Sequence, residues 1–286
     1  MCSDSTAVLQ SISEDGYAIV SSLVKDDQLS QFESDMKVLA LRQTERCGGT
    51  ASVDLPLSAV LRNLAKLNLG AYFATLRMCE SLYSLYRIAT NDGLSAVAKA
   101  LRIEVPVFPI NLRVHIMDAE INDVLEAAGG YNVTPQHQDW PALRCSLDSL
   151  VLWIPTSDIG AGEFGLDVVP GSHKRGALPT APHKFGHTLG AEVAYPDEAF
   201  VRPGMKRGDG LLFSTFLVHR TATPTGRDNF RMALGLRMSN AAHPEFIERG
   251  SPRSYRTVVE YDHGDFLNNE EKVRVYYESL AVRENS

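Results

Sequence analysis

The chain has 286 residues, 44% of them hydrophobic and 22% charged, with a formal net charge of −7. This size predicts one large hydrophobic core, or one core with a smaller helical layer. The acidic charge argues against a nucleic-acid-binding protein, and no apolar run approaches the roughly 20 residues that span a bilayer, so we expect neither nucleic acid nor membrane as a partner.

The N-terminal third is expected to begin with a strand and continue in helices. Residues Gly16–Val20 form a short apolar run typical of a strand, and Asp26–Leu41 repeats apolar residues at the three- and four-residue steps of a helix. Further helical patterns lie between residues 56 and 102. We expect these helices to pack against the outside of a larger sheet.

Strands are expected from Pro109 onward. Residues 111–117 alternate between apolar and polar side chains, and the polar side carries Asn111, Arg113 and His115. This side can face a pocket, although an exposed edge strand fits the same pattern. His115 is favoured as a pocket residue because imidazole can donate or accept a hydrogen bond.

The most informative pattern is His137-Gln138-Asp139, followed 82 residues later by His219. In an extended segment, side chains two residues apart point the same way, so His137 and Asp139 can face a common metal. His219 ends an apolar strand pattern that opens at the turn Gly208-Asp209-Gly210. Two imidazoles and one carboxylate are typical of non-haem iron oxygenases, although each histidine alone is also compatible with an ordinary hydrogen-bonded role.

The segment Phe230–Met238 alternates strictly over nine residues. One face is apolar, and the other carries Arg231 and Arg237 on either side of two residues with almost no side chain, Ala233 and Gly235. A guanidinium beside small residues is typical of a site where a small anion enters and meets a planar bidentate donor. We therefore expect Arg231 to bind a carboxylate. A solvent-facing strand with two ordinary arginines is the alternative.

Five motifs carry a resemblance to a known family. They are Gln136–Trp140, Ser149–Thr156, Gly165–Lys174, Gly208–Gly210 and His219–Thr221 followed by the Arg231 strand. In these motifs and in their order, residues 109–240 resemble the phytanoyl-CoA dioxygenase family of Fe(II)- and 2-oxoglutarate-dependent oxygenases. The N-terminal third matches only loosely.

The resemblance implies a mainly β fold with added helices, a double-stranded β-helix (a cupin-like jelly-roll) supported by helices from the N-terminal third. It implies that His137, Asp139 and His219 bind Fe(II) and are the catalytic residues, and that Arg231 binds the cosubstrate 2-oxoglutarate. It also implies that O2 is the second cosubstrate, and that a small-molecule substrate, which can be an anion, is hydroxylated at an aliphatic carbon with release of succinate and CO2.

Several further cosubstrate contacts are implied. Thr221 and Trp153 fall where the family lines its cosubstrate pocket, although Thr221 can also cap a turn and Trp153 can be a core residue. Asn111 and His115 are on the strand that commonly contributes to this pocket. The gap from His219 to Arg231 is one residue longer than usual, which leaves Arg227 as a substitute for Arg231.

The whole chain is expected to form a single domain. Residues 1–108 would be the N-terminal strand and helical support, 109–240 the jelly-roll, and 241–286 a C-terminal extension. Asp118–Thr134 and His173–Val201 are expected to be long irregular loops, typical of lids or binding loops. Pro170–His173 is expected to be a turn whose histidine is not a ligand.

The cysteines have no paired spacing and the N-terminus lacks the layout of a signal peptide, so we expect a cytoplasmic protein. The oligomeric state is left open. Two other functions fit part of the pattern: a metal-dependent hydrolase using zinc, and a non-catalytic cupin-like protein that binds a sugar or another small molecule.

Overall fold

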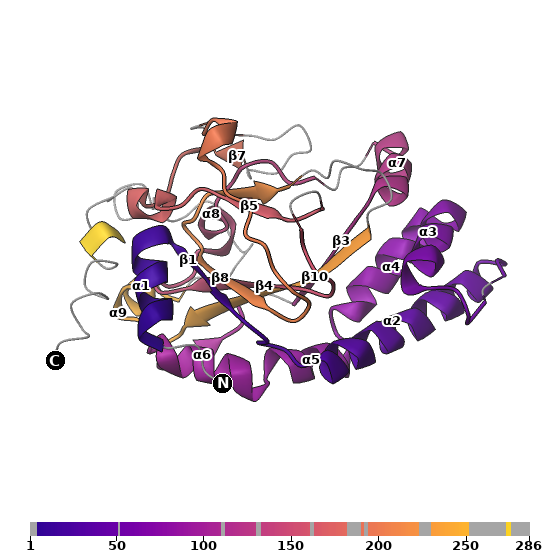
Figure 1. Cartoon of the computed structure of the whole chain (residues 1–286), viewed down its shortest axis with the longest axis horizontal. Helices are drawn as coiled ribbons and strands as arrows, with labels where there is room; N and C mark the ends of the chain where they lie inside the picture. Colours follow the sequence, from indigo (N-terminus) through magenta and orange to yellow (C-terminus); the bar gives the residue numbers. More distant parts are fainter. Residues whose placement is uncertain are drawn as a thin grey trace.

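The computed structural model describes residues 5–50, 52–109, 112–129, 133–160, 163–181, 190–191, 194–222, 230–251 and 273–275. Figure 1 shows strands in the centre of the molecule and a layer of helices from the N-terminal part of the chain along one side. Among the described residues, more lie in helices than in strands. No helix in the described part of the chain is both long enough and apolar enough to span a bilayer.

The N-terminal part contains one strand and six helices. They are α1 (Ser5–Asp15), β1 (Tyr17–Val20), α2 (Asp26–Arg46), α3 (Leu57–Leu67), α4 (Leu69–Cys79), α5 (Tyr83–Ala89) and α6 (Asp92–Ala100). The predicted strand and helices are confirmed. Helix α2 extends past Leu41 because its buried stripe continues through Thr44, and it ends where Gly48 adopts a positive φ of 79°.

The larger sheet is antiparallel and contains six strands. In addition to β1, these are β2 (Pro106–Val107), β3 (Arg113–Asp118), β4 (Leu150–Pro155), β8 (Gly210–Ser214) and β10 (Phe230–Asn240). Their order is β1-β8-β4-β10, and β3 and β2 both pair with the far side of β10. The longest strand, β10, therefore touches both β3 and β4 and aligns Gly235 with Arg113 on one side and Trp153 on the other.

The smaller sheet faces the larger one and is built from short segments. Strand β5 (Leu166–Val168) pairs with β9 (His219–Thr221), and isolated bridges join His137 to His219 and Val168 to Val201. His219 is thus paired on both sides, with His137 and with Val168. Two facing antiparallel sheets confirm the predicted jelly-roll.

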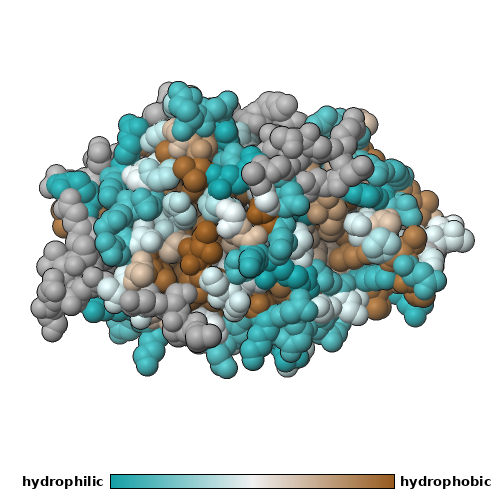
Figure 2. Space-filling model, in the orientation of Figure 1, coloured by the Kyte–Doolittle hydropathy of each residue, from teal (hydrophilic) through white to brown (hydrophobic). Residues whose placement is uncertain are grey.

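The two faces of the larger sheet belong to two different cores. Leu152, Leu212 and Leu234 face outward and pack in one cluster with the helices, which contribute Phe32 and Leu64. The residues of the opposite face pack between the sheets in a second cluster, which includes Val151, Trp153, Phe213 and Ala233. The face visible in Figure 2 is hydrophilic along its lower, helical edge, as expected for helices that turn their apolar sides to the sheet.

The first predicted loop is mostly helical, which corrects the sequence interpretation. Helix α7 (Ala119–Ala127) follows β3 directly, and the Asp118 side chain caps it by accepting a hydrogen bond from the backbone N–H of Ile121. Ile121 and Leu125 are its buried residues. The cap and the four-residue spacing were present in the sequence, but the short apolar stripe was not recognised.

The remaining described elements are short. They are α8 (Trp140–Leu143), η1 (Ser172–Arg175), β6 (Thr180–Ala181), β7 (Gly190–Ala191), η2 (Asp197–Ala199) and α9 (Pro244–Glu248). As predicted, Pro170–His173 forms a turn, with Gly171 at φ 75°. His173 is fully buried there, and its Nε2 lies 3.2 Å from the backbone oxygen of Ser13 in α1.

Candidate active site

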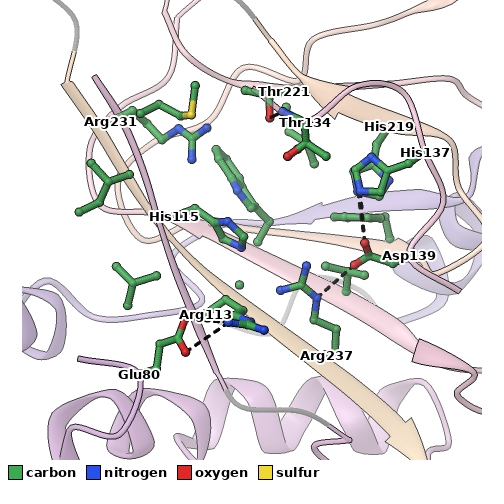
Figure 3. A pocket seen from close by; sticks show the side chains of 18 residues that line it. Glu80, Arg113, His115, Thr134, His137, Asp139, His219, Thr221, Arg231 and Arg237 are labelled. Carbon is green, nitrogen blue, oxygen red and sulfur yellow. Dashed lines mark hydrogen bonds and ion pairs between the residues drawn. The ribbon is translucent and has the colours of Figure 1, made fainter. Parts of the chain in front are cut away.

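A cavity of about 300 Å³ lies between the two sheets (Figure 3). Its polar lining comes from both sheets and from the end of helix α4. The lining includes Glu80, Arg113, His115, Thr134, His137, Asp139, Trp153, His219, Thr221, Arg231, Gly235 and Arg237. With the exception of Asn111 and Arg227, which lie outside the described residues, every residue predicted for the site borders this cavity.

His137, Asp139 and His219 come together at one end of the cavity. Each offers a ligand atom within 4.8 Å of the others, and all three are buried. Oδ1 of Asp139 lies 3.4 Å from Nε2 of His137 and 3.8 Å from Nε2 of His219. In the part of the chain that the structure describes, this is the only group of His, Cys, Asp and Glu side chains with such spacing.

The backbone fixes which nitrogen of each histidine is available. Nδ1 of His137 donates to the carbonyl of Pro135 at 2.8 Å, and Nδ1 of His219 donates to the carbonyl of Leu217 at 3.0 Å. A carbonyl can only accept, so both Nδ1 atoms carry the proton and both Nε2 lone pairs face the cavity. Burial, followed by the neighbouring His137, lowers the pKa of His219 to about 3, so its imidazole is neutral at physiological pH.

Asp139 reaches the site in a different way from the one predicted. Its backbone is helical, with φ −73° and ψ −28°, and it precedes the short helix α8, where Pro141 occupies the first turn. The extended conformation predicted through Asp139 is therefore wrong at this residue. The pairing of His137 with His219 and the hydrogen bond from the Trp140 N–H to the Thr215 carbonyl hold the turn in place.

Arg237 holds the carboxylate of Asp139 in place. Nε of Arg237 donates to Oδ2 at 3.1 Å, which leaves Oδ1 directed at the two histidines. Burial alone would raise the pKa of Asp139, but the charge of Arg237, followed by the neighbouring His137 and His219, holds it well below its usual range. The carboxylate is therefore ionised, as a metal ligand must be.

Arg231 lies across the cavity from this group. Its Nε lies 3.3 Å from the backbone oxygen of Phe164, and its guanidinium carbon is 5.1 Å from the centre of the Trp153 ring. Its buried Nη1 has no hydrogen-bond partner among the described residues. Burial lowers the pKa of Arg231 to about 9, which still leaves the guanidinium charged at neutral pH. A buried charge with an unused donor is well suited to bind an anion.

Thr221 and His115 complete the middle of the cavity. The Thr221 hydroxyl oxygen accepts from the backbone N–H of Thr134 at 3.2 Å, so its own hydrogen can be donated to a ligand. His115 projects from β3, and burial, together with the charges of Arg237 and Arg231, lowers its pKa to about 3. A Cβ atom on Gly235 would lie 2.7 Å from Nε2 of His115, so only glycine leaves room for this ring.

Three features of the cavity were not predicted. Glu80, at the end of α4, accepts from Nη1 of Arg113 at 3.3 Å, and Thr134 lines the cavity beside Thr221. No local pattern marks Glu80, because its partner is 33 residues away in the chain. The contact between Arg237 and Asp139 was also missed, although the alternation of β10 had already placed Arg237 on the same face as Arg231.

Comparison with known proteins agrees with this geometry. The family model for phytanoyl-CoA dioxygenase (PhyH) matches residues 12–233. The 1-deoxypentalenic acid 11-beta-hydroxylase of Streptomyces exfoliatus is 31% identical over 122 residues, and that of Streptomyces arenae is 31% identical over 120 residues. Each match covers 38% of this chain, and the chain spans 42% of the length of each relative.

Solved structures share the fold at low sequence identity. The non-heme monooxygenase ThoJ superposes with a TM-score of 0.57 at 17% identity, covering 82% of this chain and 77% of that one. The alpha ketoglutarate dependent epimerase SnoN from nogalamycin biosynthesis superposes with a TM-score of 0.53 at 17% identity, covering 83% of both chains. These likenesses support the fold, and the family model covers most of the sequence. This protein belongs to the phytanoyl-CoA dioxygenase family.

Proposed function

We propose that this protein is an Fe(II)- and 2-oxoglutarate-dependent dioxygenase that hydroxylates an aliphatic carbon of a small-molecule metabolite and releases succinate and CO2. The observation that carries the proposal is the pairing of two features in one cavity. Two histidines and an ionised aspartate converge at one end, and a buried arginine with an unused donor lies at the other.

The donor set fits a ferrous ion. Nε2 of His137, Oδ1 of Asp139 and Nε2 of His219 would hold it, and three ligands leave positions for an organic cosubstrate and O2 in an octahedral site. When bound, the iron supplies the oxidising chemistry that couples decarboxylation of 2-oxoglutarate to attack on a C–H bond.

The residues of the chain bind and orient the cosubstrate. Arg231 offers Nη1 to the far carboxylate of 2-oxoglutarate, Thr221 can donate its hydroxyl hydrogen to the same group, and Trp153 forms the wall behind them. The three proposed metal ligands are buried, which limits the access of water to the reacting groups. His115 borders the same space and can donate a hydrogen bond without adding a charge. Arg227 and Asn111 lie outside the described residues, and their roles stay predictions.

The two alternative functions explain less of the site. A zinc hydrolase would use the same three ligands but has no need for Arg231 in its niche, and a sugar-binding jelly-roll has no need for the metal ligands. The relatives named as hydroxylases, and the solved complex of SnoN with Fe3+, alpha ketoglutarate and nogalamycin RO, give further support to the oxygenase.

The test measures cosubstrate binding and turnover separately. Adding Fe(II) and 2-oxoglutarate without oxygen should produce a weak visible metal-to-ligand band, and admitting O2 should yield succinate. His137→Ala should lose both signals, while His243→Ala, which alters a histidine away from the cavity, should keep both. A protein that binds Zn(II) but forms no such band with Fe(II) and 2-oxoglutarate would support the hydrolase instead.

The single-domain organisation and the cytoplasmic location are part of this proposal. The first described helices and the jelly-roll share one hydrophobic cluster, which supports treating residues 1–240 as one unit. Of the C-terminal extension, residues 241–251 and 273–275 are described.

A further inference from the structure

A second group of positive charges lies in the cavity, on the opposite side of His115 from Arg231 (Figure 3). Strand pairing aligns Arg113 of β3 with Gly235 of β10, and Arg237 lies two residues further along the same face of β10. A Cβ atom on Gly235 would lie 2.8 Å from Nη1 of Arg237 and 2.7 Å from Nε2 of His115. Polar groups from two strands therefore converge where Gly235 has no side chain.

These arginines keep donors that the protein does not use. Nε of Arg237 donates to Asp139, but its Nη1 is buried and has no hydrogen-bond partner in the part of the chain that the structure describes. The Arg237 side chain as a whole is only 13% exposed. Nη1 of Arg113 donates a hydrogen bond to Glu80, and the Arg113 side chain is 41% exposed. The other N–H donors of its planar guanidinium are therefore available to a ligand. An unpaired buried donor is costly unless a ligand supplies the acceptor.

The charges of the cavity lining do not cancel. Arg113, Arg231 and Arg237 are opposed by only two carboxylates in the described lining, those of Glu80 and Asp139. A ferrous ion and the dianion of 2-oxoglutarate neutralise each other, so one positive charge remains after both have bound. A substrate with a single negative charge would balance it.

We propose that Arg113 and Arg237 form a subsite for the substrate, and that the substrate is an organic acid whose carboxylate binds there. This inference rests on the proposed dioxygenase function and adds the substrate class. A carboxylate matches both the planar donors and the single residual charge, whereas a phosphate monoester carries close to two negative charges at neutral pH. Anchoring the acid at this subsite would place its carbon skeleton in the same cavity as the three proposed metal ligands.

The experiment uses simple probes on the full chain. Protein loaded with Fe(II) and 2-oxoglutarate in the absence of oxygen is titrated with cyclohexanecarboxylate, with cyclohexanecarboxamide and with methyl phosphate, and the shift of the visible band is recorded. We expect the carboxylate to bind at least about tenfold more tightly than the amide and more tightly than the phosphate. Equal binding of carboxylate and amide, or preference for the phosphate, would overturn the assignment.

Variants locate the binding without disturbing the metal group. Arg113→Gln should weaken binding of the carboxylate about tenfold and leave binding of the amide unchanged, and Arg113→Lys should recover part of the loss. The metal group should be undisturbed, because Arg113 has no contact with the three proposed ligands in the described structure. If Arg113→Gln weakens binding of 2-oxoglutarate and leaves binding of the carboxylate probe unchanged, the subsite belongs to the cosubstrate and the inference is wrong.

The two proposals fail in different ways. If the protein forms the visible band and releases succinate but does not distinguish the acid from the amide, the dioxygenase function stands and the acid subsite is ruled out. A protein that never forms the band loses both.

Discussion

Arg237 and Asp139 form a buried ion pair in which Nε of the arginine donates to Oδ2 of the carboxylate at 3.1 Å. The other oxygen, Oδ1, faces the Nε2 atoms of His137 and His219. The arginine thereby fixes the rotation of the carboxylate and reserves one oxygen for a metal. Its charge also helps to keep the carboxyl group ionised.

Arg237→Met should weaken metal binding. Groups that hold a metal ligand in place typically contribute about 10- to 100-fold to metal affinity, and we expect a loss in this range. The measurement is a calorimetric titration of the metal-free protein with Fe(II) under nitrogen. Arg113→Met is the matched control, since it removes a guanidinium from the same cavity without a contact to Asp139, and it should bind Fe(II) as the unaltered protein does.

Arg231→Ala should raise the concentration of 2-oxoglutarate needed for the visible band. A charged hydrogen-bond partner contributes about 2 to 3 kcal/mol, which corresponds to roughly 30- to 150-fold in affinity. Fe(II) binding in the absence of 2-oxoglutarate should be unchanged, because Arg231 has no contact with the metal group. Arg227→Ala serves as the control, and an effect of Arg227→Ala in place of Arg231→Ala would move the carboxylate site to the segment after β9.

The sequence predicted the face of β10 correctly because a period of two leaves little freedom in a strand that is buried on both sides. Arg231, Gly235 and Arg237 all line the cavity as the alternation requires. The same alternation put Arg113 and His115 on one side of β3 but left open whether that side is exposed, and in the structure it lines the cavity. Local periodicity is a good guide wherever a regular strand carries the residue.

Two other parts of the site depend on contacts that no local pattern contains. Asp139 is placed by a helical turn whose position depends on the pairing of Trp140 with Thr215, and Glu80 reaches Arg113 from the end of a helix in another layer. Helix α7 is a different case, because its cap at Asp118 was visible in the sequence and the interpretation as a loop overlooked it. Long-range packing and a missed cap therefore account for separate errors.

His173 should make the stability of the protein depend on pH. Burial, partly offset by the contact with Ser13, lowers its pKa from 6.5 to about 4, so the unfolded chain takes up a proton that the folded chain does not between pH 6.5 and 4. The free energy of unfolding should therefore fall as the pH falls through this window, by about 1.4 kcal/mol for this group between pH 7.5 and 5.5.

The comparison that isolates this group is His173→Gln. Urea unfolding gives the free energy of unfolding of each protein at pH 7.5 and at pH 5.5. The fall in this free energy between the two pH values should be smaller for His173→Gln than for the unaltered protein, by the contribution of His173. Other groups titrate equally in both proteins and cancel. The same pH dependence in both would mean that His173 becomes protonated in the fold as easily as in the unfolded chain.

Gly235→Ala should impair the site while leaving the fold in place. The backbone at Gly235 has an ordinary negative φ within β10, so alanine is accommodated by the strand, but its Cβ would meet Nε2 of His115 and Nη1 of Arg237 at less than 3.0 Å. Both side chains must move, and Arg237 then holds Asp139 less well. We expect weaker Fe(II) binding together with a change in the free energy of unfolding of only about 1 kcal/mol.

Gly160→Ala is the matched control, because the nearest atom to its Cβ is 3.7 Å away on an exposed segment. Equal Fe(II) affinity in the two variants would mean that the cavity tolerates a methyl group at residue 235 and that Arg237 keeps its bond to Asp139.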